Sequence, residues 1–326
     1  MFRQLFQLYY LKDLGKLDNY TAIYMASTHD YIKDIRNENI KIYINGKFYH
    51  RPEAKISVFD SGFLLGDGVW EGIRLRKGTL IHLDAHIDRL FDGAKSIAMK
   101  MHLTKIEIVN AIWTTLKENN MKTDTHIRLI VSRGIKSTPY QHPNVTIGNP
   151  TVVIIPEYKR PNKEMIDEGI RLVSVQTRRD SGVQDPRINS LSKMNCISAC
   201  IEAEALGAQE GLMFDPHGFV STCNSTNFFI VVNNEIWTSK GEHCLNGVTR
   251  GAVIDLCQRN NILVLEKNFR IKDVYNADEA FVTGTFAGVI PVIEIDGKNM
   301  SKGSKGHLTN QIQSWYTDDI KNLSQI

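Results

Sequence analysis

The sequence has few cysteines and lacks long apolar runs. Its five cysteines include no C-x-x-C pair and leave an odd number, so the simplest interpretation is a reduced, cytoplasmic chain. No stretch approaches the ~18 consecutive apolar residues of a transmembrane helix, so we predict no membrane partner. Cys196 and Cys200, like His82 and His86, are spaced i, i+4, but neither pair has an evident third ligand. We therefore predict no metal site.

Blocks of like charge are also missing. Lysine and arginine total 39 against 36 acidic residues, and the resulting net charge of +3 is spread along the chain. This balance argues against a nucleic acid as the main partner. The first forty residues contain neither a clean apolar segment nor a small-residue cleavage site, which argues against a secretory signal. We interpret residues 1–39 as an N-terminal extension.

The length of 326 residues favours two domains, because single cores usually stop growing below that size. We predict a smaller N-terminal α+β domain over residues 40–156 and a larger C-terminal α/β domain over residues 166–310. The polar segment at 157–165, which contains a proline, is the predicted linker. Residues 311–326 are left as a C-terminal tail.

Periodicity predicts the elements of the first domain. Alternating residues at 40–44, followed by Asn45-Gly46, predict a β-hairpin. Apolar residues at helical spacing predict a helix over 83–99, and a capping box at Thr104 and Glu107 opens a second helix. Strands are expected over 126–132 and 151–156. The second domain is expected to have strands at 170–176, 211–214, 226–232, 262–266 and 279–283, and helices at about 190–206 and 249–260.

Six segments follow one another in a fixed order along residues 40–305. They are a Gly-Asp-Gly-Val-Trp-Glu-Gly turn, a His-x-x-Arg-Leu motif, a lysine-bearing helix, an Asn-Phe strand, Gly-Val-Thr-Arg and Thr-Gly-Thr; they begin at residues 66, 86, about 190, 227, 247 and 283. This series resembles the class IV (fold type IV) aminotransferases, including branched-chain and D-amino acid aminotransferases. The resemblance implies their fold, pyridoxal 5'-phosphate (PLP) as cofactor, and a homodimer.

A glycine turn at Gly247 runs into a predicted helix, so the N–H groups of Val248 and Thr249 and the Thr249 hydroxyl can face an anion. An ordinary helix start is the alternative for this segment. The resemblance implies that it holds the cofactor phosphate, together with Thr285 and Arg89. A surface salt bridge is the alternative role for Arg89.

PLP chemistry needs a lysine that forms a Schiff base with the cofactor and moves the substrate's α-proton. The family's usual interval, counted back from Glu210, reaches Asn189, whereas the only nearby lysine is Lys193. Four residues are about one helical turn, so both positions should share a helix face ~6 Å apart. We assign the Schiff base to Lys193, with a solvated helix lysine as the alternative.

A second departure from the family is at Thr222. The resemblance places Thr222 where family members carry a glutamate beside the pyridine nitrogen. A neutral hydroxyl favours ring protonation less than a carboxylate does. Reaction type is therefore predicted less firmly than cofactor.

The resemblance also places four residues at the substrate side. Trp70 falls at an aromatic pocket wall, and Arg74 and Arg128 fall where the family has arginines around the site. Arg133, near the end of the same predicted strand as Arg128, is a further candidate for a carboxylate. A core position for Trp70 and surface ion pairs for the arginines are the alternatives.

The predicted activity is transfer of an amino group from a small amino acid, with branched-chain amino acids among the candidates, to a 2-oxo acid. One alternative keeps the fold but makes the protein a lyase of the aminodeoxychorismate type, which the missing glutamate favours. Another is a non-catalytic binding homologue, which the displaced lysine favours.

Overall fold

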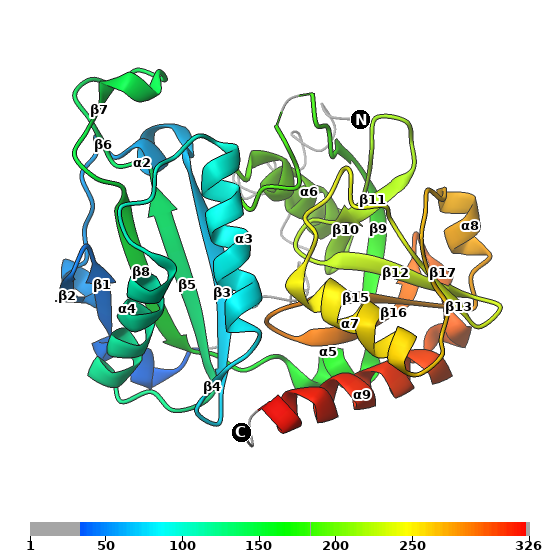
Figure 1. The fold of residues 1–326 in the computed structure, drawn as a ribbon. Helices are drawn as coiled ribbons and strands as arrows, with labels where there is room; N and C mark the ends of the chain where they lie inside the picture. Colours follow the sequence, from blue (N-terminus) through cyan, green and yellow to red (C-terminus); the bar gives the residue numbers. More distant parts are fainter. Residues whose placement is uncertain (1–32, 183, 324–326) are drawn as a thin grey trace, which may run out of the picture.

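The computed structural model describes residues 33–182 and 184–323, and these residues form two halves, each built on its own large sheet (Figure 1). Most of the predicted N-terminal extension, residues 1–32, lies outside the described residues, as do residues 183 and 324–326. Among the described helices, none is long and apolar enough to cross a membrane.

The first half is a six-stranded antiparallel sheet in the order β2-β1-β8-β5-β3-β4. Helices α3 and α4 pack on one face of this sheet, where the first hydrophobic core lies. A separate two-stranded ribbon joins β6 and β7. The elements are β1 Lys41–Ile44, β2 Lys47–His50, α2 Ser61–Leu65, β3 Gly68–Arg76, β4 Thr79–Leu80, α3 Leu83–Ser96, α4 Lys105–Glu118, β5 Thr125–Ser132, β6 Ile135–Lys136, β7 Thr146–Ile147 and β8 Thr151–Tyr158, with 3-10 turns η1 Ile35–Asn39, η2 Arg51–Glu53 and η3 Pro143–Val145.

Local sequence signals explain two of these elements. Asn45 and Gly46 have φ angles of 47° and 86°, the left-handed conformation that a tight hairpin turn requires at both central positions. At the start of α4, the Thr104 hydroxyl accepts from the Glu107 N–H at 3.2 Å, and the Glu107 carboxylate accepts from the Thr104 N–H at 2.8 Å. The predicted hairpin and capping box are therefore confirmed.

The second half is a mixed sheet whose main path is β11-β10-β9-β16-β15-β12-β13-β14, with β17 paired to β16. Helices α7 and α9 pack together against it, and α6 packs on β9 and β10. The elements are α5 Lys163–Glu168, β9 Ile170–Arg178, α6 Met194–Ala205, β10 Glu210–Phe214, β11 Val220–Cys223, β12 Asn227–Val232, β13 Glu235–Thr238, α7 Val248–Arg259, β14 Val264–Glu266, α8 Ile271–Tyr275, β15 Glu279–Gly284, β16 Gly288–Ile295, β17 Lys298–Asn299, η4 Ser301–Gly303 and α9 His307–Leu323.

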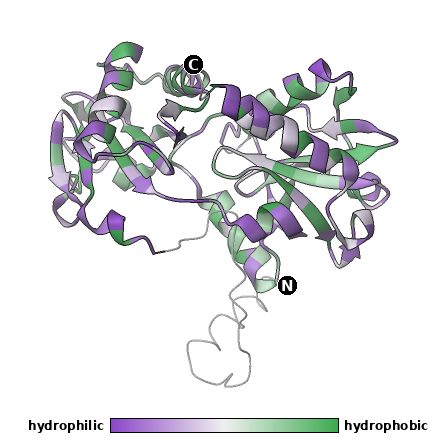
Figure 2. Cartoon of the chain, turned by 90° about the horizontal axis from the view of Figure 1, so that it is seen from below, coloured by the Kyte–Doolittle hydropathy of each residue, from purple (hydrophilic) through white to green (hydrophobic). Residues whose placement is uncertain are grey.

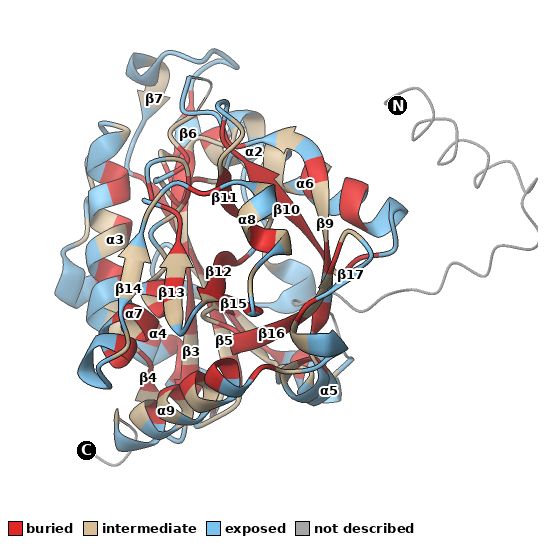
Figure 3. Cartoon of the chain, turned by 90° about the vertical axis from the view of Figure 1, so that its right-hand side faces the viewer, coloured by how far each residue is buried: buried red, intermediate tan, exposed pale blue. Residues whose placement is uncertain are grey.

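Burial separates the strands from the covering helices. Strands β12, β15 and β16 are almost wholly buried (Figure 3), as expected for strands covered on both faces. Hydrophobic residues gather on the strands, and hydrophilic residues lie on the outer sides of the helices (Figure 2). Helix α9 turns Leu308, Ile312, Tyr316 and Ile320 into the core formed with α7, a spacing of four residues that marks one helix face. The two-domain α+β and α/β architecture is thus confirmed.

The predicted start of the lysine-bearing helix, at about residue 190, is wrong. Helix α6 begins at Met194, with Lys193 as its N-cap residue, so Asn189 does not share a helix face with Lys193. Asn189 instead lies in an extended segment beside β3, where the Trp70 N–H donates to the Asn189 carbonyl at 3.0 Å. Pairing with β3 therefore decides the backbone conformation at Asn189. The apolar spacing within the segment, from which we predicted a helix, does not reveal this pairing.

Candidate active site

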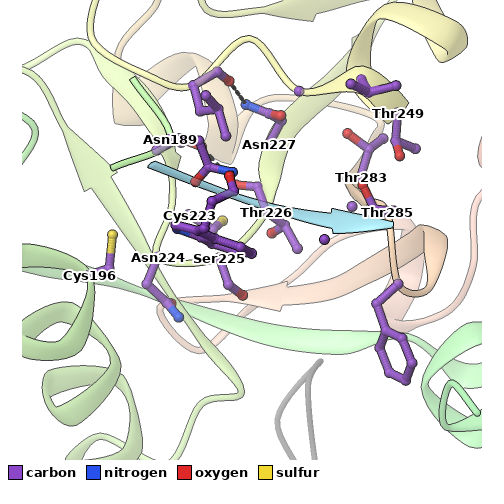
Figure 4. Close-up of a pocket in the computed structure, with 18 of the residues that line it drawn as sticks. Asn189, Cys196, Cys223, Asn224, Ser225, Thr226, Asn227, Thr249, Thr283 and Thr285 are labelled. Atoms are coloured by element: carbon purple, nitrogen blue, oxygen red, sulfur yellow. Dashed lines mark hydrogen bonds between the residues drawn. The ribbon is translucent and has the colours of Figure 1, made fainter. Parts of the chain in front are cut away.

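A cavity of about 420 Å³ lies where the two halves meet. The first half contributes β3, β5, β8 and α3. The second half contributes the start of α7 and the ends of β11, β12 and β15, from which Thr249, Cys223, Asn227 and Thr283 are labelled in Figure 4. Eight of the predicted site residues line this cavity: Trp70, Arg89, Arg128, Lys193, Thr222, Val248, Thr249 and Thr285. The structure thus brings together residues that are up to 215 positions apart in sequence, from 70 to 285.

One end of the cavity is formed by the N-terminus of α7. Gly247 is the N-cap residue, and no side chain caps the helix. A Cβ atom at Gly247 would lie 2.2 Å from Oδ1 of Asn227, so any larger residue here would displace that side chain. Asn227 itself donates from Nδ2 to the Leu245 carbonyl at 2.9 Å, which holds the turn in place. The first N–H groups of α7 therefore face the cavity and favour an anion.

A buried hydroxyl lies at the same end. Thr283, on β15, is 1% exposed and lines the cavity, and its Oγ1 has no hydrogen-bond partner among the described residues. Buried hydroxyls are normally hydrogen-bonded. Together with Thr249 and Thr285 (Figure 4), Thr283 therefore offers hydroxyl groups to a ligand held at the start of α7.

Arg89 reaches this end from the first half. Its Nε and Nη2 donate to the two carboxylate oxygens of Glu71 at 2.8 and 2.7 Å, and its Nη1 donates to the Asn246 carbonyl at 3.0 Å. His86 Nδ1 lies 2.7 Å from the same carboxylate. Burial acts to raise the pKa of Glu71, but the hydrogen bonds from His86 and Arg89 outweigh it and lower the pKa. A buried carboxylate thus fixes Arg89 beside the turn that precedes α7.

The opposite end holds Lys193, whose Nζ lies 3.1 Å from Asn189 Oδ1 and 5.4 Å from the centroid of the Trp70 ring. Burial lowers the pKa of the Lys193 ammonium to about 8. Cys196 opposes this shift, and the positive charges of Arg179, Arg128 and Arg89 add to it. Asn189 is held in turn, because its Nδ2 donates to the Trp70 carbonyl at 2.7 Å. The lysine therefore directs a readily deprotonated amine into the cavity.

Thr222 lies on β11 beside a polar network. It is 3% exposed, and its hydroxyl donates to the Thr226 carbonyl at 2.7 Å. The carboxylate of Glu210, fully buried, accepts from the hydroxyls of Ser225 at 2.6 Å and Thr226 at 2.7 Å. The proton of Thr222 is thus committed to the backbone, which leaves its oxygen lone pairs for a ligand.

The wall from the first sheet carries Trp70 and Arg128. The Arg128 guanidinium carbon lies 3.7 Å from the centroid of the Trp70 ring, a cation–π contact that holds the guanidinium over the ring. Gly72 lies two residues after Trp70 on β3 and pairs with Arg128 on β5. Its lack of a side chain keeps the wall open, because a Cβ there would lie 3.0 Å from His126 Nε2.

Two predicted substrate residues do not line the cavity. Arg133 donates from Nε and Nη2 to the Asp67 carboxylate at 2.7 and 3.0 Å and also to the carbonyls of Ile97 and Ala98. Those bonds tie the end of β5 to the end of α3. Arg74 lies on β3 next to His126 in the antiparallel register, beyond the cavity lining.

Other cavity residues were not singled out by sequence motifs. Arg179 follows β9, Lys159 follows β8, and Phe286 follows β15. Each stands three residues after the end of a predicted strand, and segments that follow strands commonly carry functional side chains. That signal is present in the sequence but is shared by many loop residues, so it does not select these three.

Known proteins resemble this chain over most of its length. A model of the family described as amino-transferase class IV matches residues 68–295. A branched-chain-amino-acid aminotransferase from Pseudomonas aeruginosa is 32% identical, covering 87% of this chain and 94% of that protein. The chain belongs to the class IV aminotransferases. A D-alanine aminotransferase from Listeria monocytogenes is 28% identical to this class IV aminotransferase, over 86% of this chain and 96% of that one.

Solved structures show the same fold. The branched-chain aminotransferase from Thermoproteus uzoniensis, solved with norvaline, superposes with a TM-score of 0.78 at 30% identity, covering 86% of this chain and 94% of that chain. Class IV aminotransferases depend on PLP. The cavity of this class IV aminotransferase fits that group in three respects: an uncapped helix N-terminus with the orphan hydroxyl of Thr283, a buried lysine amine, and an aromatic wall at Trp70.

Proposed function

We propose that this class IV aminotransferase binds PLP in the cavity and uses Lys193 as its catalytic amine, transferring an amino group from a small amino acid to a 2-oxo acid. The observation that carries the proposal is the position of the Lys193 Nζ, inside the cavity and 3.1 Å from Asn189 Oδ1. Although displaced in sequence by four residues, the amine enters the space that the other site residues surround.

At the phosphate end, the N–H groups of Val248 and Thr249 and the hydroxyls of Thr249 and Thr285 would hold the cofactor phosphate. Arg89 adds positive charge there, because two N–H groups of its guanidinium remain after those given to Glu71 and Asn246. When bound, PLP supplies an aldehyde for amino groups and a ring that withdraws electrons from the substrate's Cα. Thr222 would lie beside the ring nitrogen, where family members carry a glutamate.

Lys193 would then carry the proton at the substrate's Cα. Its pKa of about 8 leaves a sizeable fraction of neutral amine near neutral pH, as a general base requires. Arg128, held against Trp70, is placed to bind the substrate carboxylate from the opposite wall. Branched-chain amino acids are candidate donors, by similarity to the relatives named above.

Two other functions remain candidates because of single residues. Thr222 in place of a carboxylate favours a lyase, which would release pyruvate from an amino-bearing substrate without an amino acceptor. Asn189 in place of the usual lysine favours a non-catalytic binding homologue. The first is tested by measuring pyruvate with the acceptor omitted, and the second by the labelling experiment below.

A homodimer accounts for apolar surface near the cavity. Met194, Ile197 and Ile201 are 72%, 50% and 44% exposed along one side of α6, and Phe59 and Phe63 are exposed around α2. Exposed apolar groups of this extent commonly mark a protein interface. A cytoplasmic location is proposed as well, because all five cysteines are free thiols.

The test is to load the purified protein with PLP, reduce it with borohydride and identify the modified lysine by peptide mapping. We expect a visible absorption band that borohydride removes, with the label on Lys193. Lys159 also lines the cavity, so Lys159→Met is the matched control and should keep the band, whereas Lys193→Met should lose it. A label on any other lysine would refute the site, and the absence of a label would favour the binding homologue.

A further inference from the structure

Arg179 is a buried arginine that none of the family motifs uses. It lines the cavity just after β9 and is only 9% exposed. Its Nε–H is buried and finds no hydrogen-bond partner among the described residues. A guanidinium stays charged at any relevant pH, and a buried donor left unpaired is costly. Arg179 therefore points to an acceptor supplied by a ligand.

Arg179 and Thr222 stand on the two sides of the end of β10, and both line the cavity. The Arg179 N–H donates to the Phe214 carbonyl at 2.9 Å, at the end of β10. The preceding residue of β10, Met213, pairs with Thr222 of β11. The charge of Arg179 also acts on Cys223, the neighbour of Thr222, and on Lys193. Arg179 thus lies at the end of the cavity that the family resemblance assigns to the pyridine nitrogen.

The surroundings favour a pyridine nitrogen without a proton. Glu157 is the single carboxylate among the described residues that line the cavity, against five cations: Arg89, Arg128, Lys159, Arg179 and Lys193. Positive charge nearby disfavours protonation of the ring. Thr222 cannot donate to an unprotonated nitrogen, because its hydroxyl proton is given to the Thr226 carbonyl. The unpaired Nε–H of Arg179 is a donor of the required kind.

We propose that Arg179 donates a hydrogen bond to the ring nitrogen of bound PLP and keeps that nitrogen unprotonated. The inference rests on the proposed function, since it assumes that PLP binds in this cavity. Because a guanidinium holds its proton, the ring gains a hydrogen bond but no full positive charge. The ring would therefore withdraw electrons less strongly than a ring paired with a carboxylate.

The experiment measures binding of two ligands to the apoprotein by quenching of tryptophan fluorescence: PLP and 1-deaza-PLP, in which a C–H replaces the ring nitrogen. The wild-type protein should prefer PLP by about tenfold or more, as expected for one charge-assisted hydrogen bond. In Arg179→Met the preference should fall to about one. Because the preference is a ratio of two affinities measured on the same variant, a change in folding that weakens binding of both ligands equally does not alter it.

Arg178 provides the matched control, because it is exposed and stacks on Phe214 outside the cavity, 5.1 Å from the ring centroid. Arg178→Met should keep the wild-type preference for PLP. The ¹⁵N NMR shift of labelled PLP on the wild-type protein should be that of an unprotonated, hydrogen-bonded pyridine. If Arg179→Met keeps the wild-type preference for PLP, or if the NMR shift shows a protonated nitrogen, the inference about Arg179 is wrong but the proposed function is not affected. Failure of the wild type to bind either ligand would overturn the proposed function with it.

Discussion

The two ends of the cavity differ in how closely they follow the family. At the α7 end, the glycine turn, the threonines and Arg89 all occur in the family's order, and Glu71 and Asn227 hold them in place through buried hydrogen bonds. At the Lys193 end, the family resemblance places Asn189 and Thr222 where members carry the lysine and the glutamate most closely tied to the chemistry. The comparison separates the part of the cavity that the proposed function assigns to the cofactor phosphate from the few side chains that it assigns to the reaction.

The largest effect should come from the Lys193 end. Lys193→Met should reduce transfer activity by about a thousandfold, because it removes the amine that we assign to proton transfer at Cα. PLP affinity should fall far less, since the α7 end is untouched. Steady-state kinetics and equilibrium binding measure the two quantities. Equal activity of Lys193→Met and Lys159→Met would show that the chemistry lies elsewhere.

The next effect tests the α7 end through Glu71. Glu71→Gln should lower the free energy of unfolding by about 3 kcal/mol, because it leaves the charge of Arg89 buried without its partner. Urea unfolding of the apoprotein measures this. Asp318→Asn breaks an exposed ion pair with Lys321 and is the control, with an expected change below about 0.5 kcal/mol. Similar losses in both variants would mean that the buried network contributes little.

A smaller effect is expected from the turn itself. Gly247→Ala should weaken PLP binding by about ten- to a hundredfold, because its Cβ would displace Asn227 and shift the helix start. Gly251 lies in the same helix, and a Cβ added there would meet no atom within 4 Å. Gly251→Ala should therefore leave binding unchanged and stabilise the helix by about 0.5–1 kcal/mol. Titration of both apoproteins with PLP compares them.

The sequence predicts the α7 end better than the Lys193 end, for a physical reason. A helix start, a capping box and a hairpin turn depend on neighbouring residues, so their signals are local. The position of Lys193 depends on pairing of residues 189–191 with β3, more than a hundred positions away. No local period reveals that contact. The same applies to the burial of Arg179 and to the packing of α9 in the core that it forms with α7.

The pH dependence of the Lys193 end is the subtlest effect. Burial lowers the pKa of Lys193 from its ordinary 10.5 to about 8, so the ammonium predominates below pH 8 and the neutral amine above it. The rate at which apoprotein captures PLP should rise with pH and level off above about 8, with a loss of about tenfold for each pH unit below it. Stopped-flow absorbance measures this rate. Exchanging the two residues in Asn189→Lys/Lys193→Asn tests the cause, because a lysine in the β3-paired segment has different neighbours. If the pH at which the capture rate is half-maximal is the same in the exchanged variant and in the wild type, the burial of Lys193 does not set that pH.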